Sequence, residues 1–133
     1  MRPDRVMTQS AERNWDRIYA SHPDHLATGE ATACAVYPDA RNRWAHPELE
    51  AEGLEPWTVP ALWMGGGVEA ATHYLDITNA VERKIEALMS HKSQLPDPDA
   101  TAAMVRSWTG ANAQLAGLPE GRAAEAMRVV NTQ

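Results

Sequence analysis

Apolar and polar residues follow one another along this chain at two spacings, one typical of strands and the other of helices. Short apolar or alternating runs, bounded by proline, glycine and polar residues, predict strands over residues 4–10, 61–65 and 72–78. Residues 38–60 hold four prolines and little periodicity, so we expect this segment to cross the surface as a loop. The tail over residues 121–130 fits either a short helix or a final edge strand.

A first helix is expected to begin near residue 22 and to stop before Pro38. Ser21 is a favourable N-cap, and Asp24, three residues later, stands at the position of a capping-box acid. Cys34 lies in the apolar stretch "ATACAV" of the same helix, so we expect it to be a small buried residue.

The clearest helical pattern lies over residues 79–94, where Asn79 and Glu82 stand at capping-box spacing. One apolar stripe fills the i, i+4, i+7 and i+8 positions, which are Val81, Ile85, Leu88 and Met89. A last helix is expected after the prolines of "LPDPD", with Asp99 as its cap. The apolar face of that helix is expected to hold Val105, Trp108 and Leu115. The order strand, helix, strand, strand, helix, helix indicates an α/β fold.

The composition narrows the class of protein. The chain has 133 residues, of which 44% are hydrophobic and 23% charged, as in one soluble globular domain. A formal charge of -6 without a cluster of lysine and arginine argues against a nucleic-acid partner, since that binding depends on neutralising phosphates. No apolar run is long enough for a membrane span or a signal peptide, and the single cysteine fits a reducing compartment. We therefore expect a cytoplasmic protein without a membrane partner.

The stretch most informative about chemistry is "SHPDHLATGE", residues 21–30. In a first helical turn, His22, His25 and Gly29 are three and four residues apart and share one face. A helix N-terminus favours anions, imidazole is a preferred zinc ligand, and Gly29 would let a strand or substrate approach closely. The same spacing also fits a structural turn, in which His22 caps or stacks and Asp24 interacts with the helix dipole. The pair of histidines alone leaves both interpretations open.

Further motifs accompany this stretch. They are "AVYPDARN", "EGLEP" before an apolar strand, "DIT" before a helix, and "HKSQ" at the end of that helix. Together with "HPDH" they resemble the LmbE/PIG-L-type N-acetylglucosaminyl deacetylases, and the likeness runs from about residue 2 to residue 130. The resemblance implies a partial Rossmann-like sheet with flanking helices, a zinc ion, and hydrolysis of the acetamide of an N-acetylated amino-sugar conjugate.

By the same resemblance, His25 is expected to be a zinc ligand. His22 would act as general acid or would stabilise the tetrahedral oxyanion, and Asp24 would orient its neighbours in the catalytic site. Gln94, in "HKSQ", is a candidate substrate-binding residue. The other histidines have ordinary structural explanations, which are a surface position for His46, packing on a half-buried strand for His73, and a helix C-terminus for His91.

The sequence departs from this family because it contains no AHPDD motif, which supplies two zinc ligands and the general-base aspartate. Residues 1–133 are therefore expected to form the C-terminal portion of one such domain, with exposed apolar surface and an incomplete zinc site. Three hypotheses remain open: a deacetylase fragment, a non-catalytic remnant that binds a sugar or a partner protein, and one half of a split deacetylase. For the isolated chain we expect no activity, and we expect association into a homo-oligomer or with a complementing N-terminal half.

Overall fold

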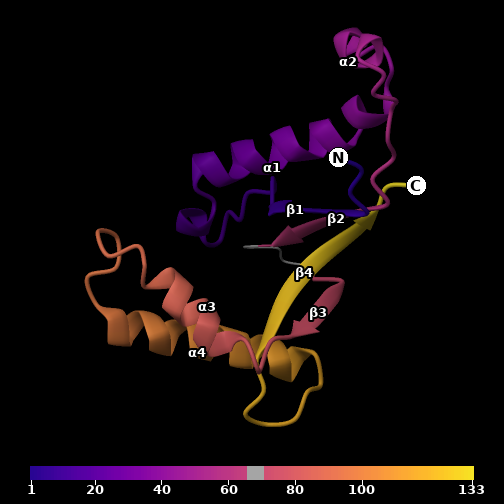
Figure 1. The fold of residues 1–133 in the computed structure, drawn as a ribbon. Coiled ribbons are helices and arrows are strands. Elements are labelled where there is room, and N and C mark those ends of the chain that lie inside the picture. The colour runs from indigo at the N-terminus through magenta and orange to yellow at the C-terminus, as the bar shows by residue number, and fades with distance from the viewer. Residues whose placement is uncertain (66–70) are drawn as a thin grey trace. The chain divides into compact units, whose positions relative to one another are not determined.

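The computed structural model describes residues 1–65 and 71–133 (Figure 1). The chain divides into two compact units, Met1–His73 with Met127–Gln133 and Tyr74–Ala126. The first unit contains β1 (Arg5–Gln9), α1 (Pro23–Val36), α2 (Pro47–Ala51) and β2 (Ala61–Gly65), with short 3-10 helices at Ile18–Ala20 and Asp39–Arg41. The second contains α3 (Val81–Leu88) and α4 (Pro98–Leu115), while β3 (His73–Asp76) and β4 (Ala124–Asn131) have residues in both.

The four strands form one mixed sheet in the order β1-β2-β4-β3. β1 and β2 are parallel, with Val6 opposite Leu62, and the chain passes through α1 between them. β4 runs antiparallel to β2, with Val130 opposite Leu62. This sheet with flanking helices confirms the predicted α/β fold class. The tail that fitted either a helix or a strand is strand β4.

The core of the first unit lies between α1 and one face of the sheet. Val36 of α1 packs with Val59 and Leu62, and all three are buried. Burying an aliphatic side chain of this size stabilises the folded state by about 1.5–3 kcal/mol. Val6 of β1 packs against this cluster, whereas Met7 alternates to the opposite face and is exposed. The edge strand β1 therefore exposes apolar surface, as expected.

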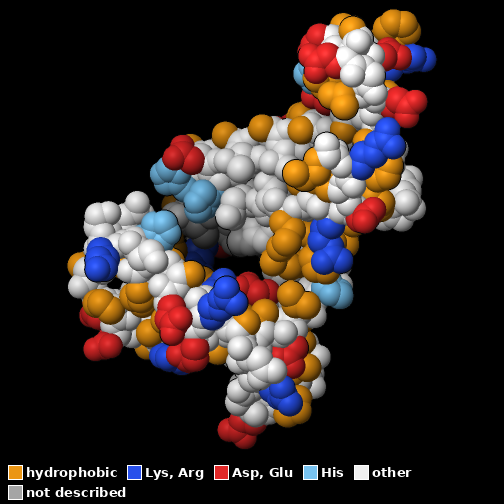
Figure 2. Space-filling model, viewed as in Figure 1, with side chains coloured by type: hydrophobic (Ala, Val, Ile, Leu, Met, Phe, Trp, Pro, Cys, Tyr) orange, Lys and Arg blue, Asp and Glu red, His pale blue; other side chains and the backbone are white. Residues whose placement is uncertain are grey.

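Hydrophobic side chains are also exposed around α2, namely Trp44, Leu49 and Leu54. Figure 2 shows hydrophobic side chains at the surface over this part of the chain. By contrast, Trp63 of β2 is buried, and Arg5 lies over its ring at 4.0 Å from the centroid. The tryptophans are thus divided between core and surface.

In the second unit, the predicted apolar stripe of α3 is confirmed. Ile85 is buried and the other three stripe residues are half-buried. The caps of both helices differ from the prediction. The N-cap of α3 is Ala80, which makes no side-chain hydrogen bond, so Asn79 is not a cap. The N-cap of α4 is Asp97, not Asp99, because the Asp97 carboxylate accepts the backbone N–H of Ala100 at 2.9 Å.

The start of α1 also differs from the prediction. The N-cap is His22, whose Nδ1 accepts the backbone N–H of Asp24 at 3.2 Å. Asp24 therefore does not act as a capping-box acid. Ser21 is buried, and its Oγ accepts the backbone N–H of Asn14 at 2.8 Å, so this oxygen is engaged away from the helix.

Two predictions of burial on the helices are wrong. Cys34 is exposed, because Val36 of the same helix takes the inward position and turns Cys34 outward. On α4, Val105 is buried but Trp108 and Leu115 are exposed. The inward positions of α4 are instead spaced four residues apart and are held by Thr101, Val105, Thr109 and Ala113.

Candidate active site

The His-Pro-Asp-His turn begins α1 at the carboxyl ends of the parallel strands β1 and β2. In a parallel crossover, the helix starts near the edge where the first strand ends. Gly29 allows α1 to cross that end closely, because a β-carbon at Gly29 would lie 2.6 Å from the carbonyl oxygen of Gln9 and 2.7 Å from the nitrogen of Ala11. The expected close approach of a strand to Gly29 is therefore confirmed. His25 and His22 precede Gly29 by one and two turns, so they lie at the edge where open α/β sheets bind ligands.

The orientation of His22 is determined by its own helix. Its Nδ1 accepts the Asp24 N–H at 3.2 Å, and the nearest carboxylate oxygen of Asp24 lies 3.6 Å from the same nitrogen. A neutral imidazole that accepts at Nδ1 carries its proton on Nε2. The His22 side chain is 60% exposed. The local structure thus presents Nε2–H of His22 as a hydrogen-bond donor, and Asp24 stabilises that tautomer through its backbone.

His25 is the second imidazole at this helix end. The centroids of the His22 and His25 rings are 5.8 Å apart, and their planes are tilted by 55°. The His25 side chain is exposed, and its backbone N–H donates to the His22 carbonyl at 3.0 Å. Within the described parts of the chain, no hydrogen bond engages the His25 ring. Its nitrogens are therefore open to a ligand or a metal.

A catalytic zinc site needs three protein ligands and an open position for water. Across residues 1–65 and 71–133, no three histidine, cysteine, aspartate or glutamate side chains lie close enough together to hold a metal ion. The donors at the start of α1 do not fit zinc by themselves, because Nδ1 of His22 already accepts a hydrogen bond. His25 can supply one ligand, and a complete site would need donors from outside this set.

Gln94 lies in the second unit, in the segment after α3, and its side chain is exposed. Its role therefore stays a prediction. His46 is exposed at the start of α2, with Nδ1 3.3 Å from Glu48, as expected for a surface residue. His73 is exposed rather than half-buried, although its ring packs edge-on against Trp63 at 4.9 Å between centroids.

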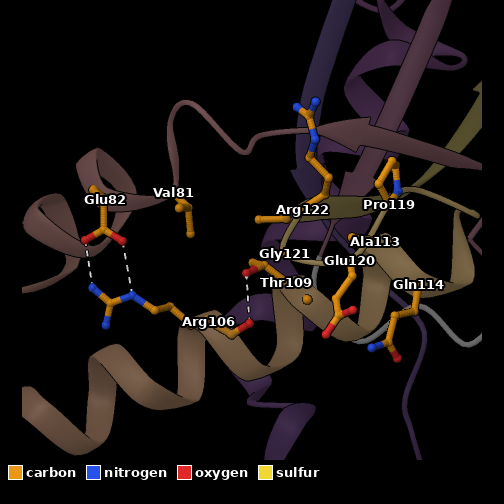
Figure 3. Close-up of a pocket in the computed structure, with 12 residues that line it drawn as sticks. Val81, Glu82, Arg106, Thr109, Ala113, Gln114, Pro119, Glu120, Gly121 and Arg122 are labelled. Atoms are coloured by element: carbon orange, nitrogen blue, oxygen red, sulfur yellow. Dashed lines mark hydrogen bonds and ion pairs between the residues drawn. The ribbon is translucent and has the colours of Figure 1, made fainter.

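The second unit contains a cavity of about 350 Å³ that the sequence did not predict (Figure 3). It lies between the first turn of α3, the middle of α4 and residues 119–123. At one side, Arg106 donates two hydrogen bonds to the Glu82 carboxylate, at 2.7 and 3.1 Å. These bonds hold the pKa of Glu82 below its ordinary value. The only sequence signal for the cavity is the pair of small residues Gly110 and Ala113 on α4.

Across the described ranges, no helix is both long and apolar enough to cross a bilayer.

Comparison with known proteins supports the fold. No protein-family model matches the sequence, and no curated protein matches it either. Among solved structures, the chain is similar to an N,N'-diacetylchitobiose deacetylase from Pyrococcus horikoshii in complex with its inhibitor MPG, with a TM-score of 0.78 and 23% sequence identity. The match covers 98% of this chain and 46% of that chain, so this chain spans about half the length of its structural relative. The chain therefore has a deacetylase-like α/β fold, as the sequence predicted.

Proposed function

We propose that residues 1–133 form the C-terminal portion of an LmbE/PIG-L-type deacetylase domain, which removes the acetyl group from an N-acetylglucosaminyl-type substrate with the help of zinc. One observation carries the proposal. The His-Pro-Asp-His turn starts a helix at the carboxyl ends of two parallel strands, in a fold similar to that of a diacetylchitobiose deacetylase. The similarity to that deacetylase supports the substrate class, and the position of the histidine turn supports its role in the reaction.

In this proposal the residues of the turn have separate roles. His25, whose ring is open, is one zinc ligand. His22 stabilises the tetrahedral oxyanion with a hydrogen bond from its Nε2–H, since its Nδ1 is held as an acceptor. Asp24 keeps His22 in that tautomer through its backbone N–H. Two further ligands and a general base are missing from this set, so the isolated 133 residues should not hydrolyse the amide.

The edge strand β1 suggests where the missing groups bind. Within the described residues, β1 pairs with β2 alone and lies at the end of the strand order. An edge strand presents unpaired N–H and C=O groups that a further strand can join. We propose that a complementing N-terminal half pairs with β1, beside the edge that carries His22 and His25. Pairing of two β1 edges in a homo-oligomer is the alternative, and the molecular mass in solution distinguishes the two.

The single cysteine supports a reducing, cytoplasmic location.

The first experiment measures the zinc content of the purified chain and its release of acetate from N,N'-diacetylchitobiose. We expect neither bound zinc nor acetate. The chain is then produced together with the polypeptide encoded immediately upstream, if that polypeptide carries AHPDD, and zinc-dependent release of acetate is expected. Turnover by the chain alone would contradict the incomplete site. A completed protein that binds the sugar without releasing acetate would instead favour the non-catalytic remnant.

Variants of the completed protein test the individual roles. His25→Ala should abolish both zinc binding and acetate release. His22→Ala should slow acetate release while zinc is retained. The matched control is His46→Ala, because His46 is also an exposed N-cap residue followed by proline at the start of a helix. That control should leave zinc content and turnover unchanged.

A further inference from the structure

The segment between β1 and α1 exposes two aromatic side chains beside the histidine turn. Trp15 is 79% exposed and Tyr19 is 73% exposed, and Ile18 between them is exposed as well. Single exposed apolar residues are normal at a protein surface, but several together mark a binding site more often. Trp15 and Tyr19, here called the aromatic pair, precede His22 by seven and three residues.

The backbone that carries the aromatic pair is tied to the start of α1. The N–H of Asn14 donates to the buried Oγ of Ser21 at 2.8 Å. The N–H of Arg17 donates to the Asn14 side chain at 2.8 Å, and the N–H of Ser21 donates to the Ile18 carbonyl at 2.9 Å. These bonds close residues 14–21 into a short loop whose ends meet next to His22. The aromatic pair is therefore held near the candidate active site by hydrogen bonds.

Each ring of the aromatic pair is also supported on one side by an arginine. The Arg13 guanidinium lies 5.5 Å from the centroid of the Trp15 ring, and that of Arg17 lies 4.7 Å from the centroid of the Tyr19 ring. Arg17 Nε also donates a hydrogen bond to the Tyr19 hydroxyl. Such cation–π contacts restrict the rings without burying them. The high exposure of both rings leaves aromatic surface free for a ligand.

We infer that the aromatic pair is a substrate subsite that packs against the apolar face of a hexopyranose ring. This inference rests on the proposed function, because the adjacent His22 is assigned to the acetamide of an amino sugar. One face of a pyranose ring presents C–H groups, which pack favourably on the electron-rich face of an aromatic ring. Tryptophan and tyrosine offer a large contact area at a low cost in conformational entropy. A disaccharide would place one sugar on the aromatic pair and the acetamide of the other at His22.

The test uses the whole chain, and the binding measurement requires neither bound zinc nor turnover. N,N'-diacetylchitobiose is titrated into ¹⁵N-labelled protein while the indole N–H signals of the tryptophans are followed. We expect a saturable shift of the Trp15 signal. Trp15→Ala and Tyr19→Ala should each weaken binding about fivefold to tenfold, whereas Trp15→Phe should retain most of it.

The chain offers a closely matched control in Trp44. It is 78% exposed, and Arg43 lies 5.7 Å from the centroid of its ring, but it stands near α2 rather than at the start of α1. The Trp44 signal should not shift, and Trp44→Ala should bind the disaccharide as the unchanged chain does. Because the replaced side chains are exposed, all variants are expected to keep the thermal transition of the unchanged chain. Trp15→Phe tests the subsite even if Trp15→Ala does not fold.

Several results would overturn the subsite. They are a Trp15 signal that does not respond to the disaccharide, binding that is unchanged in Trp15→Ala, and a Trp15 signal that shifts only when the complementing polypeptide is added. In the completed protein, Trp15→Ala should raise KM and leave kcat nearly unchanged. If the completed protein is active and Trp15→Ala leaves its KM unchanged, the subsite is refuted and the proposed function stands. Sugar binding that depends on Trp15, in a completed protein that releases no acetate, would refute the function and leave the subsite.

Discussion

A β-carbon on Gly29 would lie 2.6 Å from the carbonyl oxygen of Gln9, a separation that real side chains do not tolerate. The contact joins the second turn of α1 to the last residue of β1. It therefore determines how closely the helix crosses the end of the strand. The histidine turn, which begins the same helix, takes its position from this contact.

Replacing Gly29 tests that contact directly. Gly29→Ala should destabilise the fold by about 1–3 kcal/mol, because backbone atoms rather than a flexible side chain would have to move. Gly110→Ala is the matched control, since Gly110 lies inside α4 and a β-carbon there meets nothing within 4 Å. It should stabilise by about 0.5–1 kcal/mol through helix propensity. Urea denaturation followed by circular dichroism measures both, and equal effects of the two substitutions would argue against the contact.

The N-cap role of His22 can be separated from its proposed chemical role. His22→Ala removes the Nδ1 acceptor of the Asp24 N–H and should cost about 0.5–2 kcal/mol. His22→Asn should restore most of that stability, because asparagine is among the best N-cap residues, yet it lacks the imidazole Nε2–H. His46→Ala should cost less, since His46 makes no side-chain cap bond. Thermal unfolding measures the loss of stability in the three variants. A His22→Asn variant as unstable as His22→Ala would contradict the N-cap role of His22.

The carboxylate of Asp76 should make stability depend on acid pH. Its Oδ1 accepts the Thr78 hydroxyl at 2.6 Å and the Thr78 N–H at 2.9 Å, and these bonds lower the pKa of Asp76. A lowered folded pKa stabilises the fold fully above the unfolded value of about 3.9, and this stabilisation is lost as the pH falls through the folded pKa. Asp76→Asn should therefore flatten the loss of stability below about pH 4.

Variants of Thr78 provide the control for this pH dependence. Thr78→Val removes one of the two donors and should raise the Asp76 pKa toward its ordinary value, whereas Thr78→Ser keeps the hydroxyl and should change it little. Urea midpoints measured between pH 2 and 7 test the series. A pH profile that is identical in Asp76→Asn and the unchanged chain would refute the assignment.

The exposed Cys34 thiol should be accessible but slow to react near neutral pH. Its partly desolvated position and the nearby Glu30 carboxylate, 3.6 Å from Sγ, raise the pKa of the thiol. A raised pKa lowers the thiolate fraction, so the labelling rate should increase steeply with pH. Glu30→Gln should speed labelling at pH 7.5. A thiol reagent should modify one cysteine per folded chain, and labelling that requires denaturant would show that Cys34 is buried.

The ion pair beside the cavity of the second unit should contribute little to stability. Arg106 and Glu82 form two charge-assisted hydrogen bonds, but both side chains are more than half exposed. A double-mutant cycle of Arg106→Gln and Glu82→Gln should give a small coupling that declines as salt is added. A large coupling that salt does not change would mean that the pair is shielded from solvent in solution.

The pattern of hydrophobic residues was sufficient for β1, β2 and β3, for α3 and for the α/β class, because these follow from local periodicity of 2 and 3.6 residues. It was not sufficient for β4, whose residues fitted either a helix or a strand. The helix caps were less predictable. Ser21 has the right chemistry for a cap, but its Oγ is taken by Asn14, a choice that depends on the path of the whole loop. The burial of Cys34 was predicted wrongly for a related reason, since an apolar stretch such as "ATACAV" does not reveal which of its residues faces the sheet.

The sequence by itself determined the histidine turn, its spacing to Gly29 and the absence of an AHPDD motif. Only the tertiary structure decided that the turn stands at the carboxyl ends of β1 and β2. The bond from the Asp24 N–H to His22 and the bonds within residues 14–21 that hold Trp15 and Tyr19 near the helix start are local, but the residue pattern did not reveal them. Spacing along a chain follows from covalent geometry, whereas the meeting of strand end, loop and helix start depends on contacts between residues that are distant in sequence.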